Sequence, residues 1–357
     1  MANLLLAGYF GCGNLGDDAI LLGFLNGIAG KGHEIQTLCG SPDRVMNAYG
    51  VRGIPRLDFN EVGRALDDTD ALVFPGGSIF QDVTSMRSVA YYYKLVAMAK
   101  KRGKKVVMLG QGVGPLNGMI GRTLSAKAFN LADAVVVRDP GSSDTLRKIG
   151  YKGMPRLAAD PAFLLPTPQV EEDLPRFGVA GMKTVGISVR PFGKDKGKAV
   201  IETFAELTRI LFSNGWMPVL IEMDSAMDRS VISAIGKANG GKVPEIKNLQ
   251  SPIDVQKRMT RMDAVIAMRL HAGILASTVG VAPFMVSYDP KVTALTNLLG
   301  LPAPPTVENL NAGRIFDLFK DFQSRQESVA KTMDARRQQL VEQARGNIDA
   351  LDSVLGR

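Results

Sequence analysis

Short apolar segments rich in Val, Leu and Ile alternate with longer helical patterns along most of this chain. In the first half the apolar segments are residues 3–9, 34–38, 71–74, 105–109 and 134–137, with helical patterns such as 19–28 and 89–100 between them. Strands that are buried on both faces have continuous apolar runs of this kind, and strands that alternate with helices usually pair in parallel. The pattern therefore predicts a parallel α/β sheet.

The same alternation restarts after an irregular polar stretch. Residues 166–180 contain three prolines and the acidic run 171–173, and they are the best linker candidate in the chain. Beyond them, the segments that read as strands are residues 184–189, 217–222, 264–267 and 283–287, with helical patterns at 198–212 and 272–279. From Gly313 onward the pattern is helical and highly charged, which predicts a long C-terminal helix.

We therefore predict an α/β chain with two doubly wound, Rossmann-like domains. Residues 1–165 form the N-terminal domain, residues 166–180 the linker, and residues 181–357 the C-terminal domain with its long helix. Two such domains are expected to face one another across a cleft, where ligands bind at the carboxyl ends of the strands.

The composition narrows the class of partner. The 357 residues include 43 Lys and Arg against 35 Asp and Glu, for a net charge of +8, but the positive residues are scattered and aromatic residues make up only 6%. This composition argues against nucleic-acid binding and favours anionic substrates or a membrane surface. The two cysteines, Cys12 and Cys39, are too few for a disulfide framework.

The chain is expected to act in the cytoplasm. Its apolar start, residues 1–10, has no preceding basic residue, and Asp17 and Asp18 follow before any plausible signal cleavage site. The longest uncharged stretch, residues 272–288, contains Pro283 and reads as a helix followed by a strand, not as a membrane span.

A glycine-rich loop follows the first predicted strand. Gly11, Gly13 and Gly16 have the spacing G-x-G-x-x-G of a dinucleotide-binding loop. However, Asp17 and Asp18 would occupy the first turn of the next helix, where their charge repels a pyrophosphate. Two interpretations stay open. The carboxylates cap the helix, or the loop lines a site for a neutral, hydroxyl-rich ligand and a carboxylate binds sugar hydroxyls or acts as a base.

Two more glycine loops follow predicted strands, at residues 75–78 and 110–115. Glycine allows the backbone to approach a ligand closely, so both loops are candidates for ligand contact. Each is equally compatible with a tight turn that serves only the fold.

Three basic side chains come just after predicted strands: Arg138, His271 and Lys291. The carboxyl ends of parallel strands meet at the ligand-binding edge of a sheet, so all three are expected there. A guanidinium, an ammonium and an imidazole that converge would suit a small molecule with both a carboxylate and a phosphate. Each also has a structural alternative, in which Arg138 pairs with Asp139, Lys291 pairs with Asp289, and His271 is a buried core histidine.

Several of these segments, in order along both halves, carry a recognisable set of motifs. They are residues 8–11, 14–21, 76–85, 110–115, 137–139, 159–163, 268–272 and 287–292. Together they resemble the polysaccharide pyruvyl transferase family, of the type that attaches pyruvate to the terminal N-acetylmannosamine of bacterial secondary cell wall polymers. The resemblance implies a glycosyltransferase-B-like fold, phosphoenolpyruvate as donor, and a sugar diol as acceptor that becomes a cyclic, 4,6-linked pyruvate ketal.

The resemblance also implies site residues. Arg138, His271 and Lys291 match the residues that bind phosphoenolpyruvate. We predict His271 and Asp17 as catalytic residues, with no metal and no cofactor: cationic His271 binds phosphate or donates the proton, and Asp17 orients or deprotonates the acceptor hydroxyl. The predicted acceptor contacts are Gly11, Asn14, Asp17, Gly76, Gly77, Gln81, Asp82, Gln111 and Arg269. The chain departs from the family at Asp18, where members often have Glu, and at Ser78, where they often have a third glycine.

The partners implied are phosphoenolpyruvate and a lipid-linked or free glycan, in a pathway that anchors a surface layer to the cell wall. Peripheral contact with the inner face of the membrane is expected, nucleic-acid binding is not, and the oligomeric state stays open. Two alternatives remain: a nucleotide-sugar-dependent glycosyltransferase of the same architecture, and a non-catalytic protein that binds an anionic glycan.

Overall fold

The structure is a computed structural model that describes residues 1–82, 86–171, 174, 177, 181–193, 195, 197–307 and 311–356. The described residues form two compact units. Unit 1 comprises those within Met1–Cys12, Asp17–Pro166 and Leu340–Arg357, and unit 2 comprises those within Gly13–Gly16 and Thr167–Gln339.

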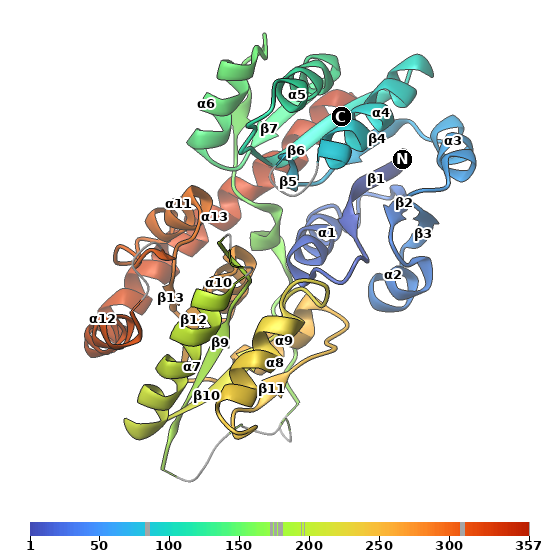
Figure 1. Cartoon of the computed structure of the whole chain (residues 1–357). Helices are drawn as coiled ribbons and strands as arrows, with labels where there is room; N and C mark the ends of the chain where they lie inside the picture. The colour runs from blue at the N-terminus through green and yellow to red at the C-terminus, as the bar shows by residue number, and fades with distance from the viewer. Residues whose placement is uncertain are drawn as a thin grey trace. The chain divides into compact units, whose positions relative to one another are not determined.

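Unit 1 contains one parallel sheet with helices packed on it (Figure 1). Its strands are β1 (Asn3–Phe10), β2 (Glu34–Cys39), β3 (Arg52–Pro55), β4 (Ala71–Phe74), β5 (Gly77–Phe80), β6 (Lys105–Val113), β7 (Ala134–Val137) and β8 (Arg156–Leu157). The strand order is β3-β2-β1-β4-β6-β7-β8, and β5 pairs with β6. The helices are α1 (Leu15–Gly27), α2 (Pro42–Tyr49), α3 (Phe59–Asp67), α4 (Met86–Lys101), α5 (Met119–Leu131), α6 (Pro140–Ile149) and the short 3-10 helix η1 (Pro161–Leu164).

The centre of this sheet is apolar on both faces, as a parallel sheet covered by helices requires. All four residues of β4 are buried, and so is most of β1. An aromatic cluster of Phe74, Phe80, Tyr92 and Phe129 packs under the sheet, with neighbouring ring centroids 4.8–6.3 Å apart. This core fixes the strands whose carboxyl ends carry the candidate site.

Unit 2 contains a second parallel sheet. Its strands are β9 (Lys183–Ser188), β10 (Trp216–Ile221), β11 (Glu245–Ile246), β12 (Ala264–Ala267) and β13 (Pro283–Met285), in the order β11-β10-β9-β12-β13. The helices are α7 (Lys198–Ser213), α8 (Arg229–Ala238), α9 (Pro252–Met259), α10 (Leu270–Thr278), α11 (Pro290–Leu298), α12 (Ala312–Ser324) and the 30-residue α13 (Gln326–Leu355). The part of α13 that starts at Leu340 belongs to unit 1.

The predicted fold class is confirmed: the chain has two parallel α/β sheets and a long C-terminal helix. All nine predicted strands are present, and β3, β5, β8 and β11 were not predicted. The loop expected at residues 110–115 is different, because residues 110–113 continue β6. Among the described residues, no helix is both long and apolar enough to cross a membrane.

The compact units differ from the predicted domain boundaries in two places. Residues 13–16 belong with unit 2, and the end of α13 belongs with unit 1, where the Asn347 side chain donates a hydrogen bond to the carbonyl of Ala159 at 2.9 Å. The linker at 166–180 stays a prediction, since residues 172, 173, 175, 176 and 178–180 lie outside the described part of the chain.

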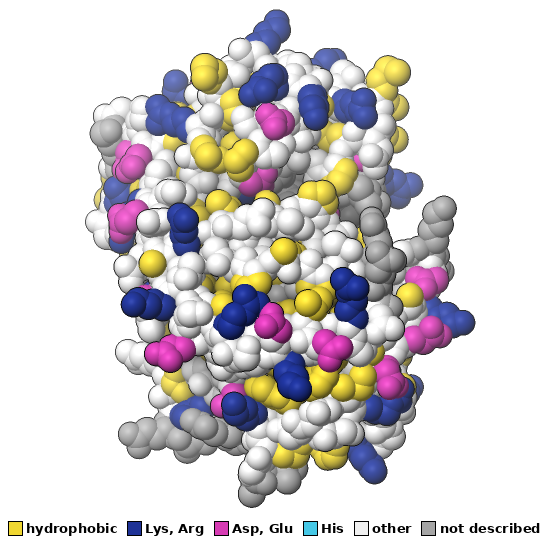
Figure 2. Space-filling model, turned by 90° about the vertical axis from the view of Figure 1, so that its left-hand side faces the viewer, with side chains coloured by type: hydrophobic (Ala, Val, Ile, Leu, Met, Phe, Trp, Pro, Cys, Tyr) yellow, Lys and Arg dark blue, Asp and Glu magenta, His cyan; other side chains and the backbone are white. Residues whose placement is uncertain are grey.

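The surface agrees with the scattered charge of the sequence. On the face that Figure 2 shows, Lys and Arg side chains are spread out and interspersed with Asp and Glu. The net positive charge is therefore not gathered into one continuous area of this face, which makes the individual basic side chains at the strand ends the more informative feature.

Candidate active site

Asp18 closes the glycine loop between β1 and α1. Its carboxylate is fully buried: Oδ1 accepts a hydrogen bond from the backbone N–H of Gly11 at 2.8 Å, and Oδ2 lies 3.8 Å from Nη2 of Arg44. Burial raises the pKa of this carboxyl to about 6, although the Gly11 N–H and Arg44 both oppose the shift. Asp18 therefore holds the loop in shape.

The middle of the glycine loop, residues 13–16, is tied to the loop that follows β10. The N–H of Leu15 donates to the carbonyl of Met223 at 2.8 Å, and the N–H of Ser225 donates to the carbonyl of Gly13 at 3.0 Å. These hydrogen bonds are made by backbone atoms, so they hold residues 13–16 in place independently of the side chains.

Gly16, which Asn14 holds by a hydrogen bond, lies next to the predicted catalytic histidine. Oδ1 of Asn14 accepts a hydrogen bond from the N–H of Gly16 at 2.9 Å, so Asn14 starts α1 through its own side chain. A Cβ added at Gly16 would lie only 2.5 Å from Nδ1 of His271. Gly16 is therefore a residue whose lack of a side chain makes room for the imidazole.

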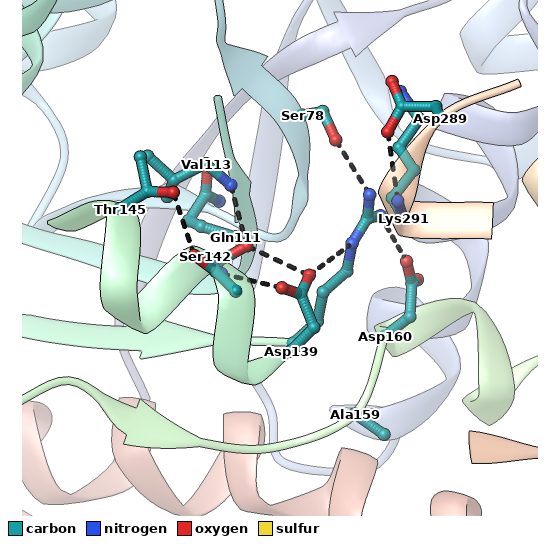
Figure 3. A network of polar contacts seen from close by, with 12 residues as sticks. Ser78, Gln111, Val113, Asp139, Ser142, Thr145, Ala159, Asp160, Asp289 and Lys291 are labelled. Carbon is teal, nitrogen blue, oxygen red and sulfur yellow. Dashed lines mark hydrogen bonds and ion pairs between the residues drawn. The ribbon is translucent and has the colours of Figure 1, made fainter. Parts of the chain in front are cut away.

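Arg138 is nearly buried, with 7% of its surface exposed, at the carboxyl end of β7. Its Nη1 donates to Oδ2 of Asp160 at 2.6 Å, and its Nη2 donates to Oγ of Ser78 at 2.8 Å (Figure 3). Oδ2 of Asp139 lies 3.9 Å from its Nε. The two hydrogen bonds orient the guanidinium while using two of its five N–H groups.

The start of β5 lies close to Asp17 at one residue and to this arginine at the next. Gly77 has a φ of +99°, and a Cβ there would lie 3.3 Å from Oδ1 of Asp17. The next residue, Ser78, accepts the hydrogen bond from Arg138. A Cβ at Gly112 would lie 2.6 Å from Oγ of Ser78 and 2.7 Å from Nη2 of Arg138. Ser78 and Arg138 therefore pack against Gly112, and Asp17 lies beside Gly77.

Two other predicted acceptor residues of unit 1, Gln111 and Asp82, form hydrogen bonds with backbone groups. Gln111 is fully buried, and its Nε2 donates to two backbone carbonyls at 3.2 and 2.8 Å. The carboxylate of Asp82 accepts two backbone N–H groups ahead of α5 at 2.8 and 2.6 Å. Gly76 is buried and packs closely on α1, and Gln81 is half-buried. The roles of Gly76 and Gln81 in acceptor binding stay predictions.

In unit 2, His271 lies in the first turn of α10, just after β12. Arg269 is turned inward: its Nε donates to both oxygens of Asp228 at 3.0 and 3.1 Å, its Nη2 also donates to Asp228, and Nη2 lies 3.5 Å from Oδ2 of Asp224. Burial lowers the pKa of Arg269, but the pairing with Asp228 raises it overall. Arg269 therefore sits in a buried ion pair that anchors the start of the histidine's helix.

Lys291 belongs to a basic and aromatic group around Tyr288. Its Nζ lies 5.8 Å from the centroid of the Tyr288 ring and 3.6 Å from Oδ2 of Asp289. Arg190, just after β9, stacks its guanidinium 4.5 Å from the same ring centroid and donates from Nη1 to the Tyr288 hydroxyl at 2.9 Å. Arg190 and Tyr288 are further candidate site residues that were not predicted from the sequence. Arg190 comes directly after a predicted strand, so the criterion that found Arg138 applies to it equally.

The structural alternatives for the two strand-end cations are also present. Arg138 lies 3.9 Å from Asp139, and Lys291 lies 3.6 Å from Asp289. Both contacts are longer than the Arg138–Asp160 pair. Asp139 accepts hydrogen bonds from the N–H and the hydroxyl of Ser142, and Asp289 accepts one from the N–H of Lys291. Lys291 therefore has a long contact with Asp289, whereas Arg138 is paired closely with Asp160 and keeps three N–H groups beyond its two hydrogen bonds.

Comparison with known proteins identifies a family. A model described as polysaccharide pyruvyl transferase matches residues 14–290, which is more than three quarters of the chain. The matched region contains Arg138 and His271 and ends one residue before Lys291.

Solved structures show the same fold at low sequence identity. A putative UDP-N-acetylglucosamine 2-epimerase from Listeria monocytogenes matches with a TM-score of 0.68 and 12% identity, covering 99% of this chain and 96% of its own. Alr3699/HepE of Anabaena, solved with UDP-glucose, matches with a TM-score of 0.61 and 12% identity, covering 99% and 100%. S. aureus MnaA, solved with UDP, has a TM-score of 0.62 and 12% identity, covering 94% and 91%. These similarities establish the fold, which is of the glycosyltransferase-B and epimerase type.

Proposed function

Because the chain belongs to the polysaccharide pyruvyl transferase family, we propose that it transfers the pyruvyl group of phosphoenolpyruvate to a sugar diol of a cell-wall polysaccharide precursor. The product would be a cyclic pyruvate ketal, and phosphate would leave. The proposed acceptor is terminal N-acetylmannosamine, ketalised at its 4- and 6-hydroxyls, on a lipid-linked or free glycan.

One observation supports the donor most directly: fixed basic side chains stand at the carboxyl edges of both parallel sheets. Arg138 is oriented by hydrogen bonds to Ser78 and Asp160. Lys291 and Arg190 both lie near the aromatic ring of Tyr288. Guanidinium and ammonium groups in fixed positions suit a ligand that carries both a carboxylate and a phosphate. We propose that Arg138, His271 and Lys291 all bind phosphoenolpyruvate.

The reaction needs one proton donor and one proton acceptor. A proton adds to the methylene carbon of phosphoenolpyruvate, which leaves an oxocarbenium-like carbon, and a sugar hydroxyl attacks that carbon and loses its proton. The C–O bond to phosphate then breaks, and a second hydroxyl closes the ketal as its proton goes to the departing phosphate. One hydroxyl proton thus replaces the proton delivered to carbon, and the other leaves with phosphate.

We assign the proton donor to His271 in its cationic form and the base to Asp17. The imidazole lies beside Gly16 at the start of α10, and Asp17 lies beside Gly77, the residue before the Ser78 that bonds Arg138. A positioned acid or base contributes about 10²- to 10⁴-fold in rate. His271→Gln is therefore expected to lower turnover by about 10²-fold or more with the fold intact.

The experiment is a phosphate-release screen with phosphoenolpyruvate and a panel of β-linked N-acetylhexosaminides, followed by product analysis for a cyclic ketal. We expect release that depends on both substrates, and a ketal on one hexosaminide. Release that is unchanged in His271→Gln would remove His271 from the chemistry. No release with any acceptor, in wild type, would contradict the proposed donor and acceptor classes.

Thermal unfolding separates this proposal from its two alternatives. Stabilisation by phosphoenolpyruvate and not by UDP or GDP sugars favours pyruvyl transfer over nucleotide-sugar transfer, since a ligand stabilises the state that binds it. A non-catalytic glycan-binding protein would bind the glycan and release no phosphate. The cytoplasmic location and the contact with the inner face of the membrane remain predictions.

A further inference from the structure

We propose that Arg56, held between Tyr9 and Tyr91, binds an oxyanion on the acceptor glycan, at a point remote from the hydroxyls that receive pyruvate. The chemical class is a glycan carried on a phosphate or diphosphate. The identification of this ligand as the acceptor rests on the proposed function, whereas the oxyanion site itself rests on the geometry of unit 1.

Arg56 follows β3 at the carboxyl edge of the first sheet and is clamped by two aromatic rings. Its guanidinium carbon lies 5.1 Å from the centroid of the Tyr9 ring and 4.8 Å from that of Tyr91. The Tyr91 hydroxyl donates to the backbone carbonyl of Arg56 at 2.9 Å, which ties the ring to the same residue. Contacts of this kind hold a guanidinium in one orientation without neutralising its charge.

No carboxylate neutralises this arginine within the described part of the chain. Among the described residues, its Nη1 donates a hydrogen bond to Sγ of Cys12 at 3.5 Å, and its Nε is buried without a hydrogen-bond partner. Burial raises the pKa of the Cys12 thiol, against the lowering effect of Arg56, and the thiol donates to the carbonyl of Phe10 at 3.4 Å. Cys12 is therefore a neutral partner at pH 7, and a fixed positive charge stays uncompensated.

The oxyanion cannot belong to the donor that Arg138 binds. Five inter-strand steps separate β3, which precedes Arg56, from β7, which precedes Arg138. With strands spaced about 4.8 Å apart, these steps correspond to about 24 Å. A three-carbon donor is far shorter than this, so a ligand that reaches both ends of the edge must be an extended acceptor.

The position of Arg56 between Tyr9 and Tyr91 suits an acceptor that passes along the sheet edge. Tyr9 is 39% exposed, and it belongs to β1 just ahead of the glycine loop. Asp17, the proposed base, follows the same loop. An acceptor could therefore place its reacting hydroxyls near Asp17 and Arg138 while its phosphate lies at Arg56.

The test compares two disaccharide acceptors that differ only in the aglycone, one joined through a diphosphate and one through a neutral linker of equal length. Arg56→Met removes the charge and keeps apolar bulk between the rings, and Arg56→Lys keeps the charge and loses the planar fork. Arg52→Met is the matched control, because Arg52 is an exposed arginine at the opposite, amino end of the same strand. Each protein is measured by calorimetric titration without donor and by kcat/KM with phosphoenolpyruvate.

We expect wild type and Arg52→Met to prefer the diphosphate acceptor by about 10- to 100-fold, in keeping with a charge-assisted hydrogen bond. Arg56→Met should lose this preference and leave affinity for the neutral acceptor unchanged, and Arg56→Lys should fall between. The inference is overturned if wild type shows no preference, if Arg56→Met keeps it, or if inorganic pyrophosphate alone binds as tightly as the diphosphate acceptor. Absence of transfer with the preference in binding intact would contradict the proposed function and leave the oxyanion site standing.

Discussion

Gly16 shows how one missing side chain shapes the site. It lies in the first turn of α1, with a backbone that any residue could adopt, yet a Cβ there would lie within 3.0 Å of three atoms of the His271 side chain. Because the backbone on either side is hydrogen-bonded, the imidazole would have to move. In the sequence this glycine reads as part of a loop motif, whereas the packing shows that it leaves room for the imidazole of His271.

Gly16→Ala is therefore expected to displace the imidazole and lower turnover by about 100-fold, the typical cost of a misplaced catalytic group. Steady-state kinetics and circular dichroism would measure activity and folding together. Gly346→Ala is the control, because a Cβ at that helical glycine would make only an ordinary contact, 3.7 Å from Ala158. Normal turnover in Gly16→Ala would mean that the imidazole is not held where the chemistry needs it.

Asp18 predicts a pH dependence of stability. Its folded-state pKa of about 6 lies above the value of about 3.9 for an unfolded Asp. The folded state therefore binds more protons between these values, and the contribution of Asp18 to stability decreases as pH rises through this window. Asp18→Asn removes the titration and keeps an oxygen for the N–H of Gly11.

The stability of Asp18→Asn relative to wild type should accordingly increase by about 1–3 kcal/mol between pH 4 and pH 7. Urea unfolding of both proteins at several pH values gives this difference directly, so that the titrations of other groups cancel. A difference that stays flat across the window would show that Asp18 does not titrate there.

The helices α6, η1 and α11 begin with the same capping arrangement. Asp139, Asp160 and Asp289 each precede a proline, and each side chain accepts a backbone N–H of the following turn at 2.7–3.0 Å. Proline at the first helical position and an oxygen at the cap are mutually reinforcing signals. Asp139 and Asp160 also flank Arg138, so the caps orient the cation as well as start the helices.

Asp139→Ala is expected to destabilise the protein by about 1 kcal/mol through loss of the α6 cap. Because Asp139 lies farther from Arg138 than Asp160 does, at a distance too long for a hydrogen bond, the KM for phosphoenolpyruvate should change by less than about threefold. Thermal unfolding and donor-dependent kinetics check the two parts separately. A large rise in KM would make Asp139 a main support of the arginine.

The apolar strands could be predicted from the sequence because their burial on both faces gives continuous runs of Val, Leu and Ile. β5 and the end of β6 could not, since Gly77, Gly110 and Gly112 carry no apolar side chain and read as loops. Their strand geometry follows from pairing with neighbours, which a local pattern does not contain. For the same reason the burial of Gln111 and the inward pairing of Arg269 with Asp228 were not predicted.

The path of the chain between the two units could not be predicted from local sequence patterns either. The last part of α13 joins unit 1, which the helix propensity of that segment does not indicate. Leu340, Ile348 and Leu351 are buried there, and Lys31 pairs with Asp352 at 2.8 Å. Burial of one such leucine or isoleucine contributes about 1.5–3 kcal/mol, so the end of the chain is a large part of a typical stability.

A chain that ends at Gln339 is therefore expected to lose protection in unit 1. Amide hydrogen exchange should accelerate in β1, α1 and η1 and change little in β9 and β10. Leu351→Ala in the full-length chain should show the same regional pattern to a smaller extent. Equal loss of protection in both units, or none in unit 1, would contradict this assignment of the C-terminal residues.

The most direct test of the proposed function is calorimetric titration of the free protein with phosphoenolpyruvate and, separately, with UDP-N-acetylglucosamine. We predict saturable binding of phosphoenolpyruvate only, weakened at least about tenfold in Arg138→Ala and in Lys291→Ala, each of which removes a charge-assisted contact. Binding of the nucleotide sugar in its place, or undiminished phosphoenolpyruvate binding in both variants, would contradict the account.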